Sequence, residues 1–266
     1  MVAIAEKTNP DHRTAFKTNW WARLGWIIAI LYVIYAANYL NVSWSRFIAG
    51  LGNGAGFLGE MVPVNFTRWK LLVGNLLETV EIAVIASAFG IVFSLPIGLF
   101  ASRNLMPSWV TWPARIFIAL CRSFHPVIFA ILFVKAVGFG PLAGILTLIF
   151  ASIGFIGKLF AEAIEEISLK PVEALRASGA PFISIIVYAV IPQVLNRFIG
   201  FSSYQFDANL RNSTMVGIVG AGGIGGTLFA AFQRFDYDFL AAILISIIGL
   251  VMVSEFLSLQ IKKVFQ

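Results

Sequence analysis

Four ionisable side chains lie inside long runs of apolar residues, where charges are rare. Arg122, His125 and Lys135 share one run, and Arg197 lies in another. An ionisable side chain at membrane depth is costly and usually faces a transport pathway, a partner charge or a water-filled cavity. Because cations outnumber anions in these runs, the chemistry that they favour is the binding of an anion. A structural alternative stays open, since Glu81 could pair with Arg122 and Lys135 could extend to the membrane surface.

A polar stretch around Arg211 adds uncharged hydrogen-bonding groups. Side-chain amides and hydroxyls beside a guanidinium are groups that can bind an oxyanion. A hydrated loop is the alternative explanation for this stretch. The candidate residues for a transport pathway or substrate site are therefore Arg122, His125, Arg197, Asn209, Arg211, Ser213 and Thr214.

Two glycine-containing patterns invite comparison with nucleotide-binding motifs, and both fail. Residues 220–225 match G-x-G-x-x-G, but that motif requires a soluble strand–turn–helix unit with an acidic residue about 20 positions later. Gly157-Lys158 is not a P-loop, because Leu159 follows it. The single cysteine and two histidines form no cluster with metal-ligand spacing. We therefore expect no enzyme active site, no metal, no cofactor, and no ATP binding by this chain.

The composition places these residues in a membrane protein. Of the 266 residues, 59% are hydrophobic and 12% are charged, whereas soluble domains average about 25% charged residues. Lysines and arginines are scattered at the edges of apolar runs and form no basic face, so we expect no nucleic-acid partner. Because backbone groups in lipid must be satisfied within the segment, we expect an all-α membrane protein.

Six runs are long enough to be transmembrane helices, which need about 20 apolar residues. They are Leu24–Val42, Ile82–Ala101, Ile116–Val137, Gly138–Gly157, Ile183–Phe206 and Phe239–Ile261. His125-Pro126 predicts a break in the third run. The charge-free segment Met215–Gln233 contains six glycines, and we interpret it as a segment that re-enters the membrane or lines a cavity.

The region between the first two runs predicts an interfacial helix within Ser43–Leu72, anchored by Arg68, Trp69 and Lys70. We accordingly divide the chain in two. Residues 1–72 hold an N-terminal tail, the first span and the interfacial segment, and residues 73–266 form the core.

The orientation follows from the excess of lysine and arginine in cytoplasmic loops. If both termini are cytoplasmic, eleven such residues lie inside, against five outside (Arg46, Arg68, Lys70, Arg211 and Arg234). The inside set is Lys7, Arg13, Lys17, Arg23, Arg103, Arg115, Lys158, Lys170, Arg176, Lys262 and Lys263. The polar segment Glu162–Phe182 then lies in the cytoplasm.

That cytoplasmic segment predicts a short helix with defined ends. Pro171 suits the first turn, and Glu173 favours the positive end of the helix dipole. Gly179 stands where a left-handed residue ends a helix, and Pro181 prevents its continuation. A helix of about two turns is not stable alone in water, so it must dock on another surface.

The same segment resembles the signature of ABC importer permeases, Glu-Ala-Ala-x3-Gly-x9-Ile-x-Leu-Pro. Here Glu173, Ala174, Gly179 and Pro192 match, while Leu175, Ala189 and Ile191 are apolar replacements. The resemblance implies a coupling helix, formed by Glu173, Ala174, Leu175 and Gly179 and followed by Pro192, that inserts into a cytoplasmic ATPase subunit. It also implies a type I importer fold in the bacterial inner membrane, a homodimer of this chain, two ATPase subunits and an extracytoplasmic substrate-binding protein.

Three longer stretches are similar to the phosphonate and phosphite permeases: residues 121–144, residues 157–167, and residues 209–228 together with 232–238. The resemblance covers about Asn75 to the C-terminus and implies transport of a phosphorus oxyanion. Methionine and glycine-betaine permeases share the glycine-rich piece, so they remain alternatives. A secondary carrier would need an internal repeat, and a membrane-embedded enzyme would need clustered acids or histidines; we find neither.

Overall fold

The structure is a computed structural model that describes the backbone of residues 20–265 and the side chains of residues 20–260. Residues 1–19, which include Lys7, Arg13 and Lys17, lie outside the described residues, as do the side chains of Lys262 and Lys263. All elements of the described part are helices. The chain divides into two compact units, Met1–Gly59 and Glu60–Gln266.

The first unit contains α1 (Trp20–Tyr39) and almost all of α2 (Trp44–Glu60). α1 is apolar over 20 residues, long enough to cross a membrane. The predicted interfacial helix is only partly correct. α2 occupies its first half, but Trp69 and Lys70 begin the next long helix, because the turn at Pro63–Arg68 ends the interfacial segment earlier than the hydropathy pattern indicates.

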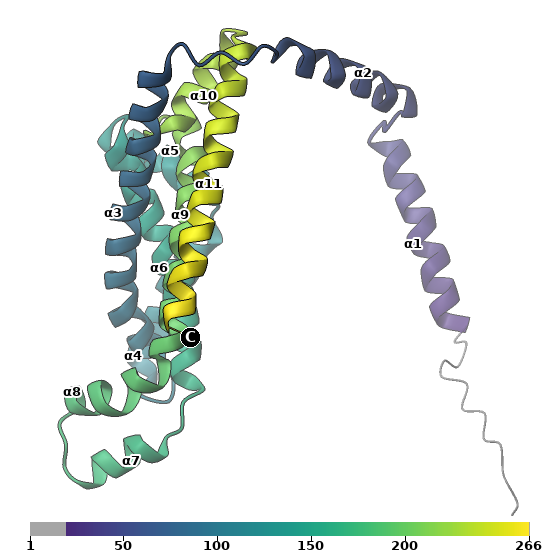
Figure 1. Cartoon of the computed structure of the whole chain (residues 1–266). Coiled ribbons are helices and arrows are strands. Elements are labelled where there is room, and N and C mark those ends of the chain that lie inside the picture. Colours follow the sequence, from purple (N-terminus) through teal and green to yellow (C-terminus); the bar gives the residue numbers. More distant parts are fainter. Residues whose placement is uncertain (1–19, 266) are drawn as a thin grey trace, which may run out of the picture. The chain divides into compact units, whose positions relative to one another are not determined.

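The second unit is a bundle of helices (Figure 1). They are α3 (Trp69–Ala101), α4 (Ser108–Ser123), α5 (Pro126–Val137), α6 (Pro141–Glu165), α7 (Lys170–Ala177), α8 (Phe182–Ile185), the π-helix η1 (Ile186–Val190), α9 (Ile191–Ile218), α10 (Ile224–Gln233) and α11 (Tyr237–Phe265). Five helices are long and apolar enough to span a membrane, and α4 with α5 makes a sixth if the bent pair counts as one. The prediction of an all-α membrane protein with about six spans is confirmed.

α6 lies at the centre of the bundle, where small residues allow its neighbours to approach closely. A Cβ added to Gly98 of α3 would lie 2.9 Å from the carbonyl oxygen of Gly157 of α6. A Cβ added to Gly154 of α6 would lie 3.1 Å from Cys121 of α4. Membrane helices commonly associate through such small residues, because lipid tails give no hydrophobic drive for packing.

The predicted spans differ from the helices in their limits; α3, for example, begins at Trp69 and not at Ile82, and α6 ends at Glu165 and not at Gly157. The third is broken at His125-Pro126 as expected, but α4 and α5 diverge by 93°, so it is not a straight crossing. The fifth is longer than predicted. α9 continues past Phe206 to Ile218, because its polar residues bond to other helices and do not form a loop.

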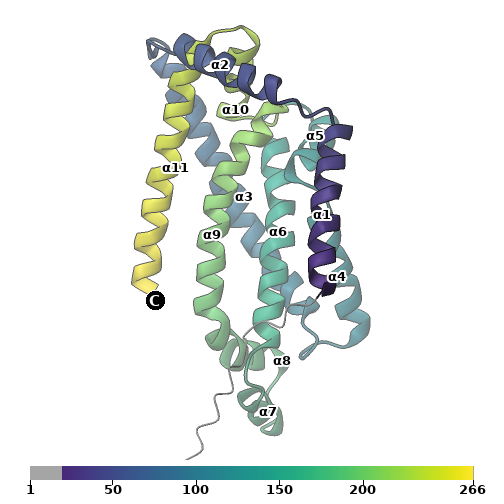
Figure 2. The same cartoon turned by 90° about the vertical axis from the view of Figure 1, so that its right-hand side faces the viewer.

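The glycine-rich segment forms a hairpin. α9 ends at Ile218, residues 219–223 turn, and the ten-residue α10 returns. Ten residues rise only about 15 Å, which is half of a membrane core, so α10 does not span. Figures 1 and 2 show α10 at one end of this unit and α7 with α8 at the opposite end, with α11 running back toward α7.

Candidate functional site

α7 has the limits that its sequence predicts. Pro171 lies in its first turn with Glu173, and the helix ends at Ala177. Gly179 adopts φ +75°, and its N–H donates to the carbonyl of Arg176 at 3.0 Å. No heavy atom would lie within 4 Å of a Cβ at Gly179. The glycine is therefore required by its backbone conformation and not by a neighbour.

One face of α7 is anchored and the other is open. Val172 is 1% exposed and packs in a cluster with Ile185 and Val190, against which Leu175 is partly buried. Glu173, Ala174, Arg176 and Ala177 are exposed. A two-turn helix therefore presents a free polar and small-residue surface beyond the end of the bundle.

The base of this segment is tied to α9 by side chains. Gln193 accepts a hydrogen bond from the N–H of Ser168 at 3.0 Å and donates to its carbonyl at 3.3 Å. Arg197 forms an ion pair with Glu166 at the end of α6. The segment that precedes α7 is thus tied by side chains to α9, and Glu166 at the end of α6 takes part. The structure places Arg197 at this base, among exposed residues, and not beside the other predicted pathway residues.

Pro192 lies at the second position of α9, directly after η1. Proline donates no backbone hydrogen bond and clashes with the preceding turn, and a π-helical turn is one way in which a helix accommodates such an interruption. The segment that joins α7 to the long α9 is therefore irregular helix and not a continuous rod.

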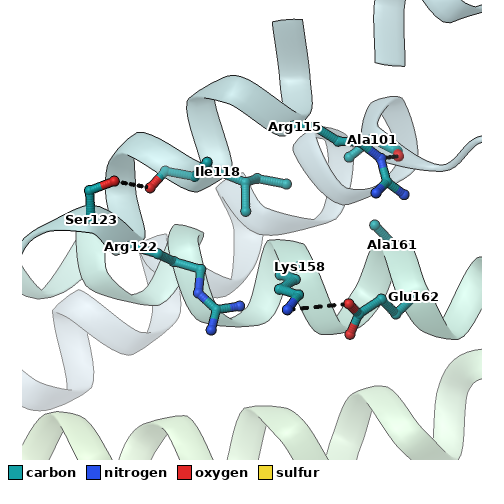
Figure 3. A pocket seen from close by; sticks show the side chains of 9 residues that line it. Ala101, Arg115, Ile118, Arg122, Ser123, Lys158, Ala161 and Glu162 are labelled. Carbon is teal, nitrogen blue, oxygen red and sulfur yellow. Dashed lines mark hydrogen bonds and ion pairs between the residues drawn. The ribbon is translucent and has the colours of Figure 1, made fainter. Parts of the chain in front are cut away.

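Arg122 lies in the last turn of α4 and lines a pocket of about 360 Å³ between α4 and α6. Figure 3 shows its guanidinium and the ammonium of Lys158 projecting to the same side of this pocket. The lining residues are Ala101, Arg115, Ile118, Ala119, Arg122, Ser123, Lys158, Ala161 and Glu162. The cavity is therefore predominantly cationic.

His125 caps the N-terminus of α5, where its Nδ1 accepts from the N–H of Val127 at 3.4 Å. It is exposed and lies at the bend between α4 and α5. The predicted alternative of a Glu81–Arg122 pair is not among the ion pairs of the described residues. His125 and Arg122 thus share the bend, on separate helices.

Asn209 is fully buried in a polar network that joins three helices. Its Nδ2 donates to Ser87 of α3 and to Ser152 of α6, both at 2.9 Å, and Gln205 donates to its Oδ1 at 2.9 Å. Buried polar groups that satisfy one another hold helices in one arrangement. This position gives Asn209 a role in packing within a single chain.

The remaining predicted residues also lie on α9. Ser213 is buried and donates to the carbonyl of Leu210 at 2.8 Å, and Thr214 packs against the glycine hairpin. Arg211 is exposed and lines a separate cavity of about 150 Å³ with Asp207 and Glu255. Of the seven predicted pathway residues, only Arg122 lines the pocket between α4 and α6.

Sequence reasoning missed several residues of these sites. In the sequence, Arg115 and Lys158 indicate membrane orientation, but their spacing from Arg122 and Glu162 on helical faces is also consistent with a shared cavity. Gln193 and Gln205 carry no charge, and nothing in the local sequence distinguishes them from other polar residues on a long helix. Among the described residues, no group of three or more His, Cys, Asp or Glu is placed to hold a metal ion.

Comparison with known proteins identifies the family. Residues 94–265 match the family described as "Binding-protein-dependent transport system inner membrane component". The chain is 36% identical over 254 residues to the phosphite transport system permease protein PtxC of Stutzerimonas stutzeri, covering 94% of this chain and 92% of that protein. It is 42% identical to the phosphate-import permease protein PhnE of Mycolicibacterium smegmatis over 76% of this chain, which is 38% of that longer protein.

Solved structures show the same fold. The inward-facing MetNI methionine ABC transporter includes a chain that superposes with a TM-score of 0.67 at 23% identity, covering 76% of this chain and all of that one. An amino acid ABC transporter gives a TM-score of 0.58 at 19% identity. The predicted type I importer permease fold is confirmed, as is the assignment to a multi-pass inner-membrane transport subunit that is not itself an enzyme. The chain belongs to the family of inner-membrane components of binding-protein-dependent transport systems.

Proposed function

We propose that this chain is the permease of an ATP-driven importer that carries a phosphorus oxyanion such as phosphonate, phosphite or phosphate. Relatives named as phosphite or phosphate permeases match most of the chain and not only a local motif. Two phosphite permeases of Stutzerimonas stutzeri match over 94% and 87% of the chain, the second at 33% identity. The surplus of cations over acids in the bundle suits an anionic cargo.

The observation that carries the transport mechanism is α7. It is a short helix anchored on one face, open on the other, and tied at its base to α6 and α9 by Ser168–Gln193 and Glu166–Arg197. We propose that the open face, with Glu173 and Ala174, docks in a groove of an ATPase subunit. Closure of the ATPases on binding ATP then moves α7. The Ser168–Gln193 and Glu166–Arg197 contacts pass that movement to the spanning helices.

The assembly that we propose contains two copies of this chain, two ATPase subunits and one extracytoplasmic binding protein. α7 and both chain termini lie on the cytoplasmic side, which puts the turn between α10 and α11 outside. That turn is tied to the start of α3 by the Arg68–Asp236 ion pair and by Asn65 donating to Asp238 at 2.9 Å. We propose that this outer end receives the binding protein.

We assign Arg122 and His125, at the bend of α4 and α5, to the substrate pathway, with Arg211, Ser213 and Thr214 as further candidates on α9. Arg197 and Asn209 support the pathway indirectly in this proposal. Arg197 braces the coupling segment, and Asn209 fixes the packing of α3, α6 and α9.

Uptake by proteoliposomes tests the proposal. The chain would be reconstituted with its ATPase and binding protein, and uptake of labelled phosphite, phosphate and methylphosphonate compared with uptake of methionine. We expect ATP-dependent uptake of at least one oxyanion, none of methionine, and no ATPase activity of the isolated chain. Methionine uptake without oxyanion uptake would assign the chain to the methionine class. ATP hydrolysis by the clean, isolated chain would contradict the proposal that a separate ATPase subunit hydrolyses ATP.

A further inference from the structure

The pocket between α4 and α6 contains a cation that no carboxylate neutralises. Arg115 pairs with Glu165 at 2.5 Å, and Lys158 pairs with Glu162 at 3.4 Å. Among the residues that the structure describes, Arg122 forms no ion pair with a carboxylate. Three cations and one carboxylate, Glu162, thus line the pocket, and Arg122 is the lining cation without an ion-pair partner among the described residues.

The position of Arg122 is set by packing and not by a salt bridge. A Cβ at Gly154 of α6 would lie 2.8 Å from Cγ of Arg122, so the stem of the arginine lies directly over this glycine. Figure 3 shows the guanidinium reaching beyond the stem toward the side of the pocket occupied by Lys158. Arg122 is exposed, so its unpaired guanidinium is accessible to a ligand while the start of its stem is in contact with α6.

The size and the remaining lining groups define the class of ligand. The volume of about 360 Å³ lies in the lower part of the range for small-molecule sites, about 300–1,000 Å³. A guanidinium binds two oxygens of a tetrahedral oxyanion at once, and an ammonium adds a point charge. The Ser123 hydroxyl, which donates to the carbonyl of Ala119 at 2.8 Å, adds a further polar group to the wall.

We propose that this pocket binds a tetrahedral phosphorus oxyanion, with Arg122 as its principal ligand and Lys158 as its second. If the bound oxyanion is the transported substrate, this inference rests on the proposed function. The same chemistry would bind the phosphate of a lipid headgroup, so the experiment separates these two sources. Glu162 is the internal competitor in this site, because it pairs with Lys158 when the anion is absent and favours release.

The test measures binding of ³²P-labelled inorganic phosphate to the permease–ATPase complex in nanodiscs of neutral lipid, without the binding protein. We expect Arg122→Gln to weaken binding about tenfold or more, as for loss of a charged hydrogen-bonding pair. Glu162→Gln should tighten it about two- to fivefold, the scale of an exposed ion pair. Arg46→Gln, which removes the same charge from α2, should change binding less than twofold.

Arg122→Lys keeps the charge and most of the stem but loses the bidentate geometry, so it should give an intermediate affinity. If the Arg122→Gln complex assembles poorly, the Arg122→Lys complex still allows phosphate affinity to be measured with an altered residue 122. Equal phosphate affinity in the wild type, Arg122→Lys and Arg122→Gln would overturn the proposal.

A second arm identifies the source of the anion. In nanodiscs with phosphatidylglycerol, native mass spectrometry counts the retained anionic lipids. A headgroup site predicts that the wild type retains lipid that competes with phosphate and that Arg122→Gln loses it. A substrate site predicts phosphate binding unaffected by the lipid. No phosphate binding and no difference in lipid retention would overturn both versions. This binding result is independent of the uptake assay, so the pocket can be assigned even if the transported substrate is not a phosphorus oxyanion.

Discussion

The coupling segment at α7 and the glycine hairpin between α9 and α10 both contain glycines with positive φ, but their surroundings differ. A Cβ at Gly179 would meet no atom within 4 Å. In the hairpin, a Cβ at Gly222 would lie 2.9 Å from both the Glu78 carboxylate and Pro141, and a Cβ at Gly225 would overlap the carbonyl oxygen of Thr214. Gly179 serves only a local backbone conformation, whereas the hairpin glycines also allow close contacts between distant segments.

In the mechanism proposed above, α7 is the part that moves, and the hairpin belongs to the fixed framework. α7 is attached through the face that carries Val172 and through polar bonds at its base, while its opposite face is open. The hairpin is locked by backbone and side-chain contacts to α3 and α6, including the N–H of Gly140 on the carbonyl of Gly220 at 3.0 Å. Substitutions in the hairpin should therefore reduce stability, while those in α7 should reduce coupling.

The largest effect on stability is expected for Gly225→Ala. The new methyl group would meet backbone atoms, the Thr214 carbonyl and the Ile218 nitrogen, which cannot rotate away. Overpacking of this kind costs about 1–3 kcal/mol and sometimes more, and we expect the upper end. Fluorescence-detected size exclusion after heating would measure the loss. Gly226→Ala is the matched control, because its nearest atom would be 3.5 Å away; equal melting temperatures for the two variants would contradict the locked hairpin.

Thr79→Val should have the next largest effect. The Thr79 hydroxyl accepts from the N–H of Ile224 at 2.8 Å and donates to the carbonyl of Asn75, so it caps the start of α10. Valine has nearly the same shape but leaves a buried donor unsatisfied, at a cost of about 1–3 kcal/mol. Thr79→Ser keeps the hydroxyl and should melt much closer to the wild type. If valine and serine have the same effect, the hydrogen bond is not what holds the hairpin.

Gly179→Val should leave the bundle intact. Valine in a left-handed conformation is strained by about 1–2 kcal/mol, but there is space for its side chain. The strain falls on an exposed segment, so we expect α7 to change its ending while the melting temperature of the inserted protein stays within a few degrees of the wild type. A drop as large as that of Gly225→Ala would show that α7 is part of the structural core.

Glu173→Ala should have the smallest effect. It removes a first-turn charge whose interaction with the helix dipole is worth about 0.3–1 kcal/mol at an exposed site. Glu173 is exposed in this chain, so a clear loss of uptake in Glu173→Ala would indicate a lost contact between Glu173 and the ATPase. Glu173→Asp keeps the charge and is the control; equal uptake for aspartate and alanine would exclude a contribution from the charge.

The two regions also differ in how far the sequence predicts them. The limits of α7 and the left-handed Gly179 were predicted from Pro171, Glu173 and the glycine itself, because helix ends are determined by adjacent residues. The hairpin was expected to re-enter, but its partners, Thr79 and Pro141, are far away in the chain. No local pattern identifies them.

The same distinction explains the candidate sites. Arg122 was predicted because a charge in an apolar run is visible in the sequence. Its association with Lys158 depends on α4 crossing α6 at Gly154, which only the packing shows. Asn209 was expected in a pathway or a loop, yet α9 continues through it, and its amide bonds to Ser87 and Ser152 across two helices.

ATP hydrolysis by the reconstituted complex, measured with and without loaded binding protein, tests the coupling role of α7 most directly. The informative pair is Gly179→Val and Gly179→Asn, because asparagine tolerates a left-handed conformation and valine does not. We predict that Gly179→Asn retains most of the stimulation by the loaded binding protein, whereas Gly179→Val assembles normally but loses stimulation and uptake together. Normal stimulation in a fully assembled Gly179→Val complex would contradict the account, because α7 would then be an ordinary loop helix with no part in coupling.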